Sequence, residues 1–211
     1  ILFILGIFTS FSLEPYNIII INFLTYPIFF IIFKIHSSKK IKAFLSGWSF
    51  GFGYFVSNLY WISYSLTYEE IFKPLIPLTI ILVPAMLAIF YGSATLFSSF
   101  FRMNYNLSSI LIFSVFLSMT EYFRGVLFTG FPWNLISYSL TIFKENIQIL
   151  SLIGTYSLNL LLITFFLFPI VILFNTSRKY KYFITSITIS LAFLNYFYGA
   201  YKINLFSEIS Y

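Results

Sequence analysis

The sequence predicts an all-α protein, built as a polytopic bundle of about seven transmembrane helices. Hydrophobic residues make up 60% of its 211 residues and charged residues only 9%, whereas ordinary soluble domains carry about 25% charged residues. Too few polar side chains are present to cover a soluble core of this size. Segments such as Ile18–Ile21 and Leu160–Ile163 are apolar on every side, whereas apolar and polar residues alternate in barrel strands. Helices therefore explain the sequence better than a transmembrane barrel.

Seven runs almost free of charged residues are candidate spans, because a helix needs about 20 apolar residues to cross roughly 30 Å of hydrocarbon. They are Ile1–Leu13, Tyr16–Phe33, Ala43–Leu66, Pro74–Phe101, Leu107–Phe123, Ile147–Phe174 and Tyr182–Tyr201. The first run is short, and we expect residues upstream of Ile1 to complete it. Pro27 interrupts the second span, which neighbouring helices can accommodate. Gly47 and Gly51 in the third span have the spacing that lets two helices approach closely.

The charges predict how the spans are oriented. If the loop after the second span is cytoplasmic, that side carries eight basic residues and the opposite side four. The eight are Lys34, Lys39, Lys40, Lys42, Arg102, Arg178, Lys179 and Lys181. All six acidic residues, which are glutamates, fall on the opposite side. Because Lys and Arg accumulate on the cytoplasmic side of membrane proteins, we expect a cytoplasmic N-terminus and an external C-terminal segment, residues 202–211.

Several kinds of chemistry are excluded by composition. The chain has no Cys and no Asp, and His36 is its one histidine, so the sequence predicts no disulfide framework, no metal site and no cofactor. The net charge of +6 does not indicate a nucleic-acid partner, because membrane-length apolar runs separate the basic residues and prevent a continuous basic face.

The end of the fifth span holds the candidate functional residues. Glu121 and Arg124 are three residues apart on one helical face, so they can pair; a charged pair there is costly unless it faces protein or water. Gly125 and Gly130 then allow a sharp reversal of the chain. Two interpretations stay open: a salt bridge that pins a helix end beside an aromatic anchor, or a lipid-facing gate in which Arg124 meets a phosphate. The candidate lipid-binding residues are Glu121, Arg124, Phe131, Pro132 and Trp133.

This stretch resembles the membrane-region signature of the apolipoprotein N-acyltransferase family. The matching segments are Glu121–Gly125, then Phe128–Trp133, then Ser137–Ser139. The family pattern is roughly Glu-Trp-x-Arg-Gly, followed by Phe-Thr-Gly-Phe-Pro-Trp and Gly-Tyr-Ser. Tyr122 stands where the family usually has Trp, and Ser137 where it usually has Gly; both are mild departures.

Two further stretches extend the resemblance over nearly the whole chain. Gly47–Gly53 is similar to part of the family's third helix, and Ile153–Asn159 to the start of its sixth. The resemblance implies a bacterial inner-membrane enzyme with a helix bundle and an extracytoplasmic nitrilase-like domain inserted before the last helix. Such enzymes move an acyl chain from a phospholipid donor to the α-amino group of the N-terminal cysteine of an apolipoprotein acceptor. The nitrilase-like domain supplies a Glu-Lys-Cys triad, in which Cys forms the acyl-enzyme thioester.

That triad cannot be placed on this sequence, which has no Cys, so no catalytic residue is assigned. We expect residues 1–201 to form the transmembrane region and residues 202–211 to lead toward a missing nitrilase-like domain, with a separately encoded catalytic half as a partner. The isolated chain is then expected to be inactive. The alternatives are a small multi-span transporter, a lipid-binding membrane protein, or a decayed remnant.

Overall fold

The computed structural model describes residues 1–128, 130–174 and 177–209, with side chains as far as Leu205, and every regular element within these ranges is helical. Seven helices correspond one by one to the predicted spans: α1 (Leu2–Ser10), α2 (Asn22–His36), α3 (Lys40–Leu59), α4 (Ile76–Ser98), α5 (Leu107–Val126), α8 (Thr155–Phe174) and α9 (Arg178–Ile209). Two single-turn helices, α6 (Lys144–Ile147) and α7 (Leu150–Ile153), precede α8. The 3₁₀ segments are η1 (Ile19–Ile21), η2 (Tyr60–Thr67), η3 (Glu70–Leu75) and η4 (Ile136–Leu140). The predicted all-helical membrane fold is confirmed.

Five helical segments in the described ranges are long and apolar enough to cross a membrane. They are Ile19–His36, Glu70–Ser98, Leu107–Val126, Thr155–Phe174 and Arg178–Leu205. With nine residues, α1 extends only about 14 Å at 1.5 Å per residue. The 20-residue α3 packs against both α1 and α4. Seven predicted spans are thus roughly consistent with five full-length candidates and two further bundle helices.

Three predicted boundaries differ from the structure. The third span was expected to run to Leu66, but α3 ends at Leu59 and the chain tightens into the 3₁₀ segment η2. The sixth was expected to begin at Ile147, but Gly154, at φ +76°, ends α7, and the long helix α8 begins only at Thr155. Residues 202–209, assigned by sequence to a segment beyond the last span, continue the helix α9.

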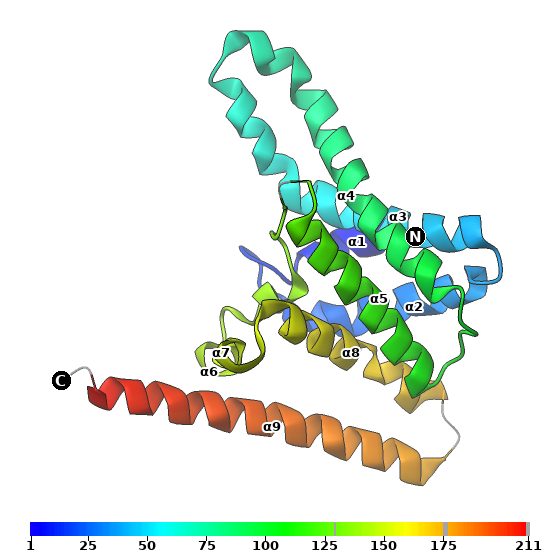
Figure 1. Ribbon diagram of the computed structural model, residues 1–211, viewed down its shortest axis with the longest axis vertical. Helices are drawn as coiled ribbons and strands as arrows, with labels where there is room; N and C mark the ends of the chain where they lie inside the picture. The colour runs from blue at the N-terminus through cyan, green and yellow to red at the C-terminus, as the bar shows by residue number, and fades with distance from the viewer. Residues whose placement is uncertain (129, 175–176, 210–211) are drawn as a thin grey trace.

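Close packing of α3 between α1 and α4 forms one side of the bundle. A Cβ added to Gly51 would lie 2.8 Å from the Cβ of Tyr91 on α4, so only glycine allows this approach. A Cβ on Gly47 would clash with the backbone carbonyl of Tyr91. The predicted packing role of these two glycines is confirmed. Beyond this contact, η2, η3 and the first turns of α4 extend away from the bundle, and α9 runs along the opposite side (Figure 1).

The bundle has two chemically different ends. At one end, α2 and α8 finish and α3 and α5 begin; there Lys40 donates to Ser99, and the rings of Tyr105 and Phe174 stack 4.1 Å apart. At the other end, α3 and α5 finish and α8 begins, joined by the loop that follows α5. We call these the basic end and the loop end. Between them lies an aromatic core, in which the ring of Phe29 stacks 4.0 Å from that of Phe50.

Candidate functional site

A buried ion pair lies at the loop end of the bundle. Glu121 and Arg124, on the last turns of α5, are each only 1% exposed. The Nη2 of Arg124 donates to the Oε2 of Glu121 at 3.1 Å. Their three-residue spacing on a helix brings both side chains to one face. The predicted pairing is therefore confirmed, and it occurs inside the protein rather than on its surface.

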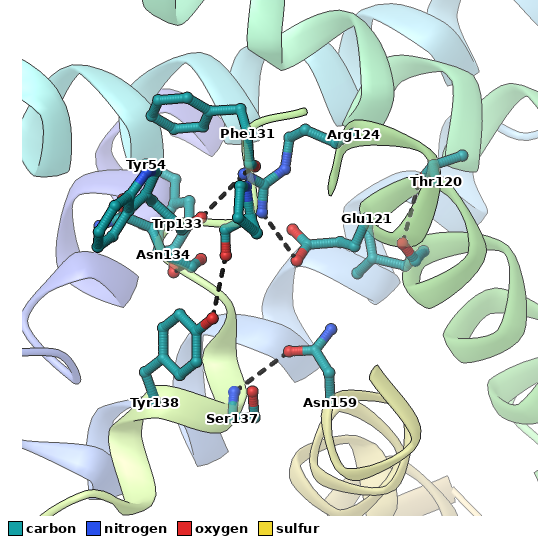
Figure 2. A network of polar contacts seen from close by, with 12 residues as sticks. Tyr54, Thr120, Glu121, Arg124, Phe131, Trp133, Asn134, Ser137, Tyr138 and Asn159 are labelled. Atoms are coloured by element: carbon teal, nitrogen blue, oxygen red, sulfur yellow. Dashed lines mark hydrogen bonds and ion pairs between the residues drawn. The ribbon is translucent and has the colours of Figure 1, made fainter. Parts of the chain in front are cut away.

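The same guanidinium group also binds the loop that follows α5. Its Nη1 donates to the carbonyl oxygen of Phe131 at 2.6 Å and to that of Trp133 at 2.8 Å (Figure 2). The ring of Phe55 on α3 lies 5.1 Å from the centre of the guanidinium, within the range of a cation–π contact. One side chain thus holds a carboxylate and two backbone carbonyls in a fixed arrangement, which suits the rigid donor fork of arginine.

The loop reaches this position by reversing directly after α5. The helix ends at Val126, and the backbone N–H of Phe131 donates back to the carbonyl oxygen of Arg124 at 2.8 Å. Gly130 adopts φ +80°, and a Cβ there would lie 2.5 Å from the carbonyl oxygen of Gly125. The predicted reversal at Gly130 is confirmed. Thr129, which belongs to the motif named above, lies outside the described residues.

Tyr54, Tyr138 and Asn159, which were not among the predicted site residues, complete the support of the loop. The hydroxyl of Tyr54, on α3, donates to the carbonyl oxygen of Asn134 at 2.8 Å. The hydroxyl of Tyr138 donates to the carbonyl oxygen of Pro132 at 3.2 Å. Partial burial, with the nearby phenol of Tyr156, raises the pKa of Tyr138 above its ordinary value of 10.0, so this donor keeps its proton at neutral pH.

Asn159 anchors the far side of the same loop. Its Oδ1 accepts from the backbone N–H of Ser137 at 3.2 Å, and the residue is fully buried on α8. An amide within an apolar span is a recognisable signal, since polar residues in membrane helices usually serve a structural or functional contact. Tyr54 carries no comparable signal, because tyrosine is abundant throughout this chain.

The interior beneath the loop is polar. Four atoms there are buried without a hydrogen-bond partner among the described residues: Glu121 Oε1, Arg124 Nε, Ser137 Oγ and Asn159 Nδ2. Figure 2 shows the Asn159 amide lying on the side toward the Glu121 carboxylate. Within the described part of the chain, no three His, Cys, Asp or Glu side chains gather in a way that could hold a metal ion. The site therefore offers hydrogen-bonding and charged groups rather than metal ligands.

The outer surface of the loop is apolar and accessible. Trp133 is 58% exposed, Pro132 is exposed and Phe131 is partly buried. A cavity of about 230 Å³ lies beside them, lined by Leu13, Glu14, Trp61, Trp133, Asn134, Tyr138 and Thr141. The structure thus brings all five predicted residues together. Glu121 and Arg124 are buried, whereas Phe131, Pro132 and Trp133, which we call the aromatic tip, lie at the outer side of the loop. That these residues bind lipid stays a prediction.

Comparison with known proteins places this geometry in a family. Residues 5–168 match the family model described as the apolipoprotein N-acyltransferase N-terminal domain. An apolipoprotein N-acyltransferase of Rhodopseudomonas palustris is 36% identical over 185 residues, which is 83% of this chain and 34% of the relative. One of Brucella melitensis is 31% identical over 170 residues, 74% of this chain and 31% of the relative. This chain thus spans about a third of the length of these relatives. Because the family model covers more than half of the chain, the protein belongs to the apolipoprotein N-acyltransferase family.

Proposed function

We propose that this chain forms the membrane-embedded part of an apolipoprotein N-acyltransferase, which transfers an acyl chain from a phospholipid to the N-terminal cysteine of a lipoprotein. Family membership supports the reaction class. The observation that carries the proposal is the loop held by Arg124, which presents Pro132 and Trp133 beside a cavity of about 230 Å³. An exposed aromatic tip on a rigid loop at a helix end is the arrangement expected of a lipid contact at the membrane–water boundary.

Within this proposal the five predicted residues have two different roles. Pro132 and Trp133, with the partly buried Phe131 beside them, contact lipid, because Pro132 and Trp133 form the accessible surface. Arg124 and Glu121 position that surface from beneath. Three donors of Arg124 are already used by Glu121 and two loop carbonyls, so a phosphate could reach its Nη1 only by displacing the loop. This division favours a positioning role for Arg124 over direct contact with a phosphate.

Acyl transfer itself requires a nucleophile from elsewhere. The family resemblance implies a cysteine that forms a thioester, and these 211 residues contain none. We therefore propose that they act together with a catalytic half that carries the thiol, and that on their own they transfer no acyl chain. The catalytic half would approach the loop end, where Trp133 and the cavity are accessible.

The proposed orientation follows from the charges. Lys34, Lys40 and Arg102 lie together at the basic end, and Arg178 begins α9 just after α8 finishes at that same end. By the positive-inside rule, this end faces the cytoplasm of a bacterial inner membrane and the loop end faces outward. The loop would then meet lipids of the outer leaflet and the lipoprotein acceptor.

A chimaera tests the proposal. This chain replaces the matching third of the Rhodopseudomonas palustris relative, and the product is expressed in a bacterium depleted of its own N-acyltransferase. We expect N-terminal lipopeptides to gain the mass of one acyl chain, as measured by mass spectrometry. A chimaera present in membranes at the level of the parent enzyme that leaves lipoproteins unacylated would refute the proposed function.

Two further experiments test the need for a separate catalytic half and the role of the loop. The 211-residue chain alone should yield no N-acylated product in the same assay, and any product would contradict the proposed need for a separate thiol. A chimaera carrying Trp133→Ala should lose acyl transfer through a raised KM for phospholipid. The matched surface change Trp61→Ala should have a smaller effect, because Trp61 lines the cavity but lies outside the loop that Arg124 holds. Equal effects of the two changes would contradict the special role of the loop.

A further inference from the structure

A larger cavity lies at the basic end of the bundle, at the opposite end of α5 from Arg124. It has a volume of about 530 Å³ and opens where the turn between α2 and α3 faces the connection between α4 and α5. Its polar lining consists of Lys34, Ser37, Ser38, Lys40, Ser99 and Arg102. Three cations and three hydroxyl groups therefore surround one space, brought there from two separate connections of the chain.

No carboxylate balances these cations among the described residues. The two ion pairs in the described ranges are Lys73–Glu70 and Arg124–Glu121, and both lie toward the loop end. Glu14 lines the cavity beside Trp133, also at the loop end. The electrostatic potential in the basic cavity is consequently positive, and cations gathered at the edge of a low-dielectric bundle repel one another unless an anion binds between them.

Neutral partners hold two of the three cations in place without cancelling their charge. Lys40 Nζ donates to the carbonyl oxygen of Ser99 and to its hydroxyl, the latter at 3.2 Å, and lies 4.3 Å from the ring centre of Phe100. Lys34 Nζ lies 4.5 Å from the ring centre of Tyr105. Such carbonyl and cation–π contacts orient an ammonium group but leave its net charge uncompensated.

Arg102 is the cation best placed to take an external ligand. Its side chain is exposed and makes no hydrogen bond or ion pair with the described residues. The guanidinium fork matches the oxygens of a phosphate group and can bind two of them at once. Ser38, which is also exposed, adds a hydroxyl group at the same rim.

The surroundings of the cavity indicate a lipid rather than a soluble phosphate. Phe101 lines the cavity and is 49% exposed, while Phe100 beside it is 65% exposed. Exposed aromatic side chains at the ends of membrane spans suit contact with acyl chains and the headgroup region. Basic pockets between transmembrane helices on the cytoplasmic side are known sites for anionic headgroups.

We propose that the cavity lined by Lys34, Lys40 and Arg102 binds the phosphate of an anionic phospholipid, from the leaflet opposite the one that the Trp133 loop meets. This lipid is therefore not the acyl donor. Its phosphate bridges the α2–α3 turn and the α4–α5 connection, and so adds to the hydrogen bonds by which Lys40 already joins these two parts at Ser99. The site lies apart from the loop that Arg124 holds; the statement that its lipid is not the acyl donor rests on the proposed function, whereas binding of the phosphate does not.

Native mass spectrometry of the full chain, released from nanodiscs, tests the proposal. Phosphatidylglycerol is the probe, phosphatidylcholine is the zwitterionic comparison, and inorganic phosphate is the soluble competitor. We expect retained phosphatidylglycerol on the wild-type chain. The triple variant Lys34→Gln/Lys40→Gln/Arg102→Gln should bind it on the order of 100-fold more weakly, since it removes all three cations that line the cavity and could make charge-assisted contacts with the phosphate.

A charge-matched control separates a built site from a diffuse surface field. Lys39→Gln/Lys42→Gln/Lys179→Gln removes three exposed charges from the same end without touching the cavity lining, and should change binding only a few-fold. Equal losses in the two triple variants would overturn the proposal, as would equal retention of phosphatidylcholine. Displacement of the lipid by millimolar inorganic phosphate would identify a soluble phosphate site instead and overturn the assignment to lipid.

A single substitution at Arg102 tests the same site with less risk that the variant fails to fold. Arg102→Gln changes an exposed side chain that makes no hydrogen bond or ion pair with the described residues, and it should weaken binding about fivefold. Arg102→Lys, which keeps the charge but not the fork, should bind with an affinity between those of the wild type and Arg102→Gln. An unchanged affinity in Arg102→Gln would contradict the role assigned to this residue.

Discussion

The two ends of the bundle place cations in opposite situations. At the loop end, Arg124 is 1% exposed, and Glu121 and two backbone carbonyls take up its donors. At the basic end, Lys34, Lys40 and Arg102 face a cavity of about 530 Å³ with no acidic side chain among the described residues that line it. The buried cation is thus paired within the protein, whereas the other three line an open cavity without a carboxylate partner among the described residues.

This difference shows why a motif arginine need not bind a substrate phosphate. Removing a charge from water is costly unless it is paired and hydrogen-bonded, and Arg124 satisfies that condition with groups of its own chain. Its hydrogen bonds to the carbonyl oxygens of Phe131 and Trp133 support the proposed role of Arg124 in positioning the loop. At the basic end, Lys40 has neutral partners, the carbonyl oxygen and hydroxyl of Ser99, and no carboxylate pairs with Lys34, Lys40 or Arg102 among the described residues.

The largest expected effect comes from removing the buried cation. Arg124→Ala leaves Glu121 buried without its counterion and frees the carbonyl oxygens of Phe131 and Trp133. Breaking one side of a buried ion pair costs about 3–5 kcal/mol. The free energy of unfolding, measured by denaturant titration in detergent micelles, should fall by that amount.

The matching change at the basic end is Arg102→Ala. Because this side chain is exposed and makes no hydrogen bond or ion pair with the described residues, its loss should alter the free energy of unfolding by no more than about 0.5 kcal/mol. A similar loss of stability in both variants would remove the contrast between the two ends.

A double-mutant cycle sharpens the same contrast. Glu121→Gln and Arg124→Gln should each destabilise the chain, but the double variant should be more stable than the sum of the two losses predicts. Directly paired residues show coupling energies of about 0.5–3 kcal/mol, and this buried pair should lie in the upper half of that range. The same cycle on the exposed pair Glu70 and Lys73, whose atoms approach to 2.5 Å, should give about 0.5 kcal/mol or less. Equal coupling in the two cycles would show that burial does not set the strength of these pairs.

The sequence predicted the helices and the ion pair because both depend on local spacing. Hydrophobic runs define the spans, and a separation of three residues places Glu121 beside Arg124. The third span was predicted too long because hydropathy does not distinguish α3 from the 3₁₀ segment η2 that follows it. The sixth span was predicted as one continuous run from Ile147. Gly154 lies within that run, and glycine commonly ends a helix, as it ends α7 here.

The contacts that hold the loop could not be predicted in the same way. Arg124 reaches carbonyls seven and nine residues further along, and the hydroxyl of Tyr54 reaches Asn134 across 80 residues. These contacts depend on positive φ angles at Phe128, Gly130 and Asn134, which set the loop path. Of these three residues, only glycine adopts positive φ angles readily, so only Gly130 strongly indicates this conformation in the sequence.

A smaller effect is expected for the support of the loop from α3. Tyr54→Phe removes one hydrogen bond, from its hydroxyl to the carbonyl oxygen of Asn134 at 2.8 Å, and leaves the ring in place. A neutral hydrogen bond contributes about 1 kcal/mol, so unfolding should become easier by that amount. Tyr64→Phe, on the exposed η2 segment, serves as the matched control and should leave stability unchanged. No difference between the two variants would mean that the loop does not depend on α3.

The smallest effect on stability should come from Trp133, the residue for which the proposed function gives the most direct contact with lipid. Trp133 is 58% exposed, and its backbone carbonyl, rather than its side chain, binds Arg124. Trp133→Ala should therefore change the free energy of unfolding by no more than about 0.5 kcal/mol.

The proposed contact of Trp133 with lipid can be measured separately by fluorescence, in a chain whose other tryptophans, Trp48 and Trp61, are replaced by Phe. In vesicles of brominated phospholipid, bromine near the headgroup should quench Trp133 more strongly than bromine near the chain end, because interfacial aromatic residues lie at headgroup depth. Arg124→Gln in the same background should weaken that depth preference, since the loop then loses its fixed path. A Trp133 signal that brominated lipid does not quench would place the loop away from the bilayer, and the exposed tip would then be a surface for protein rather than for lipid.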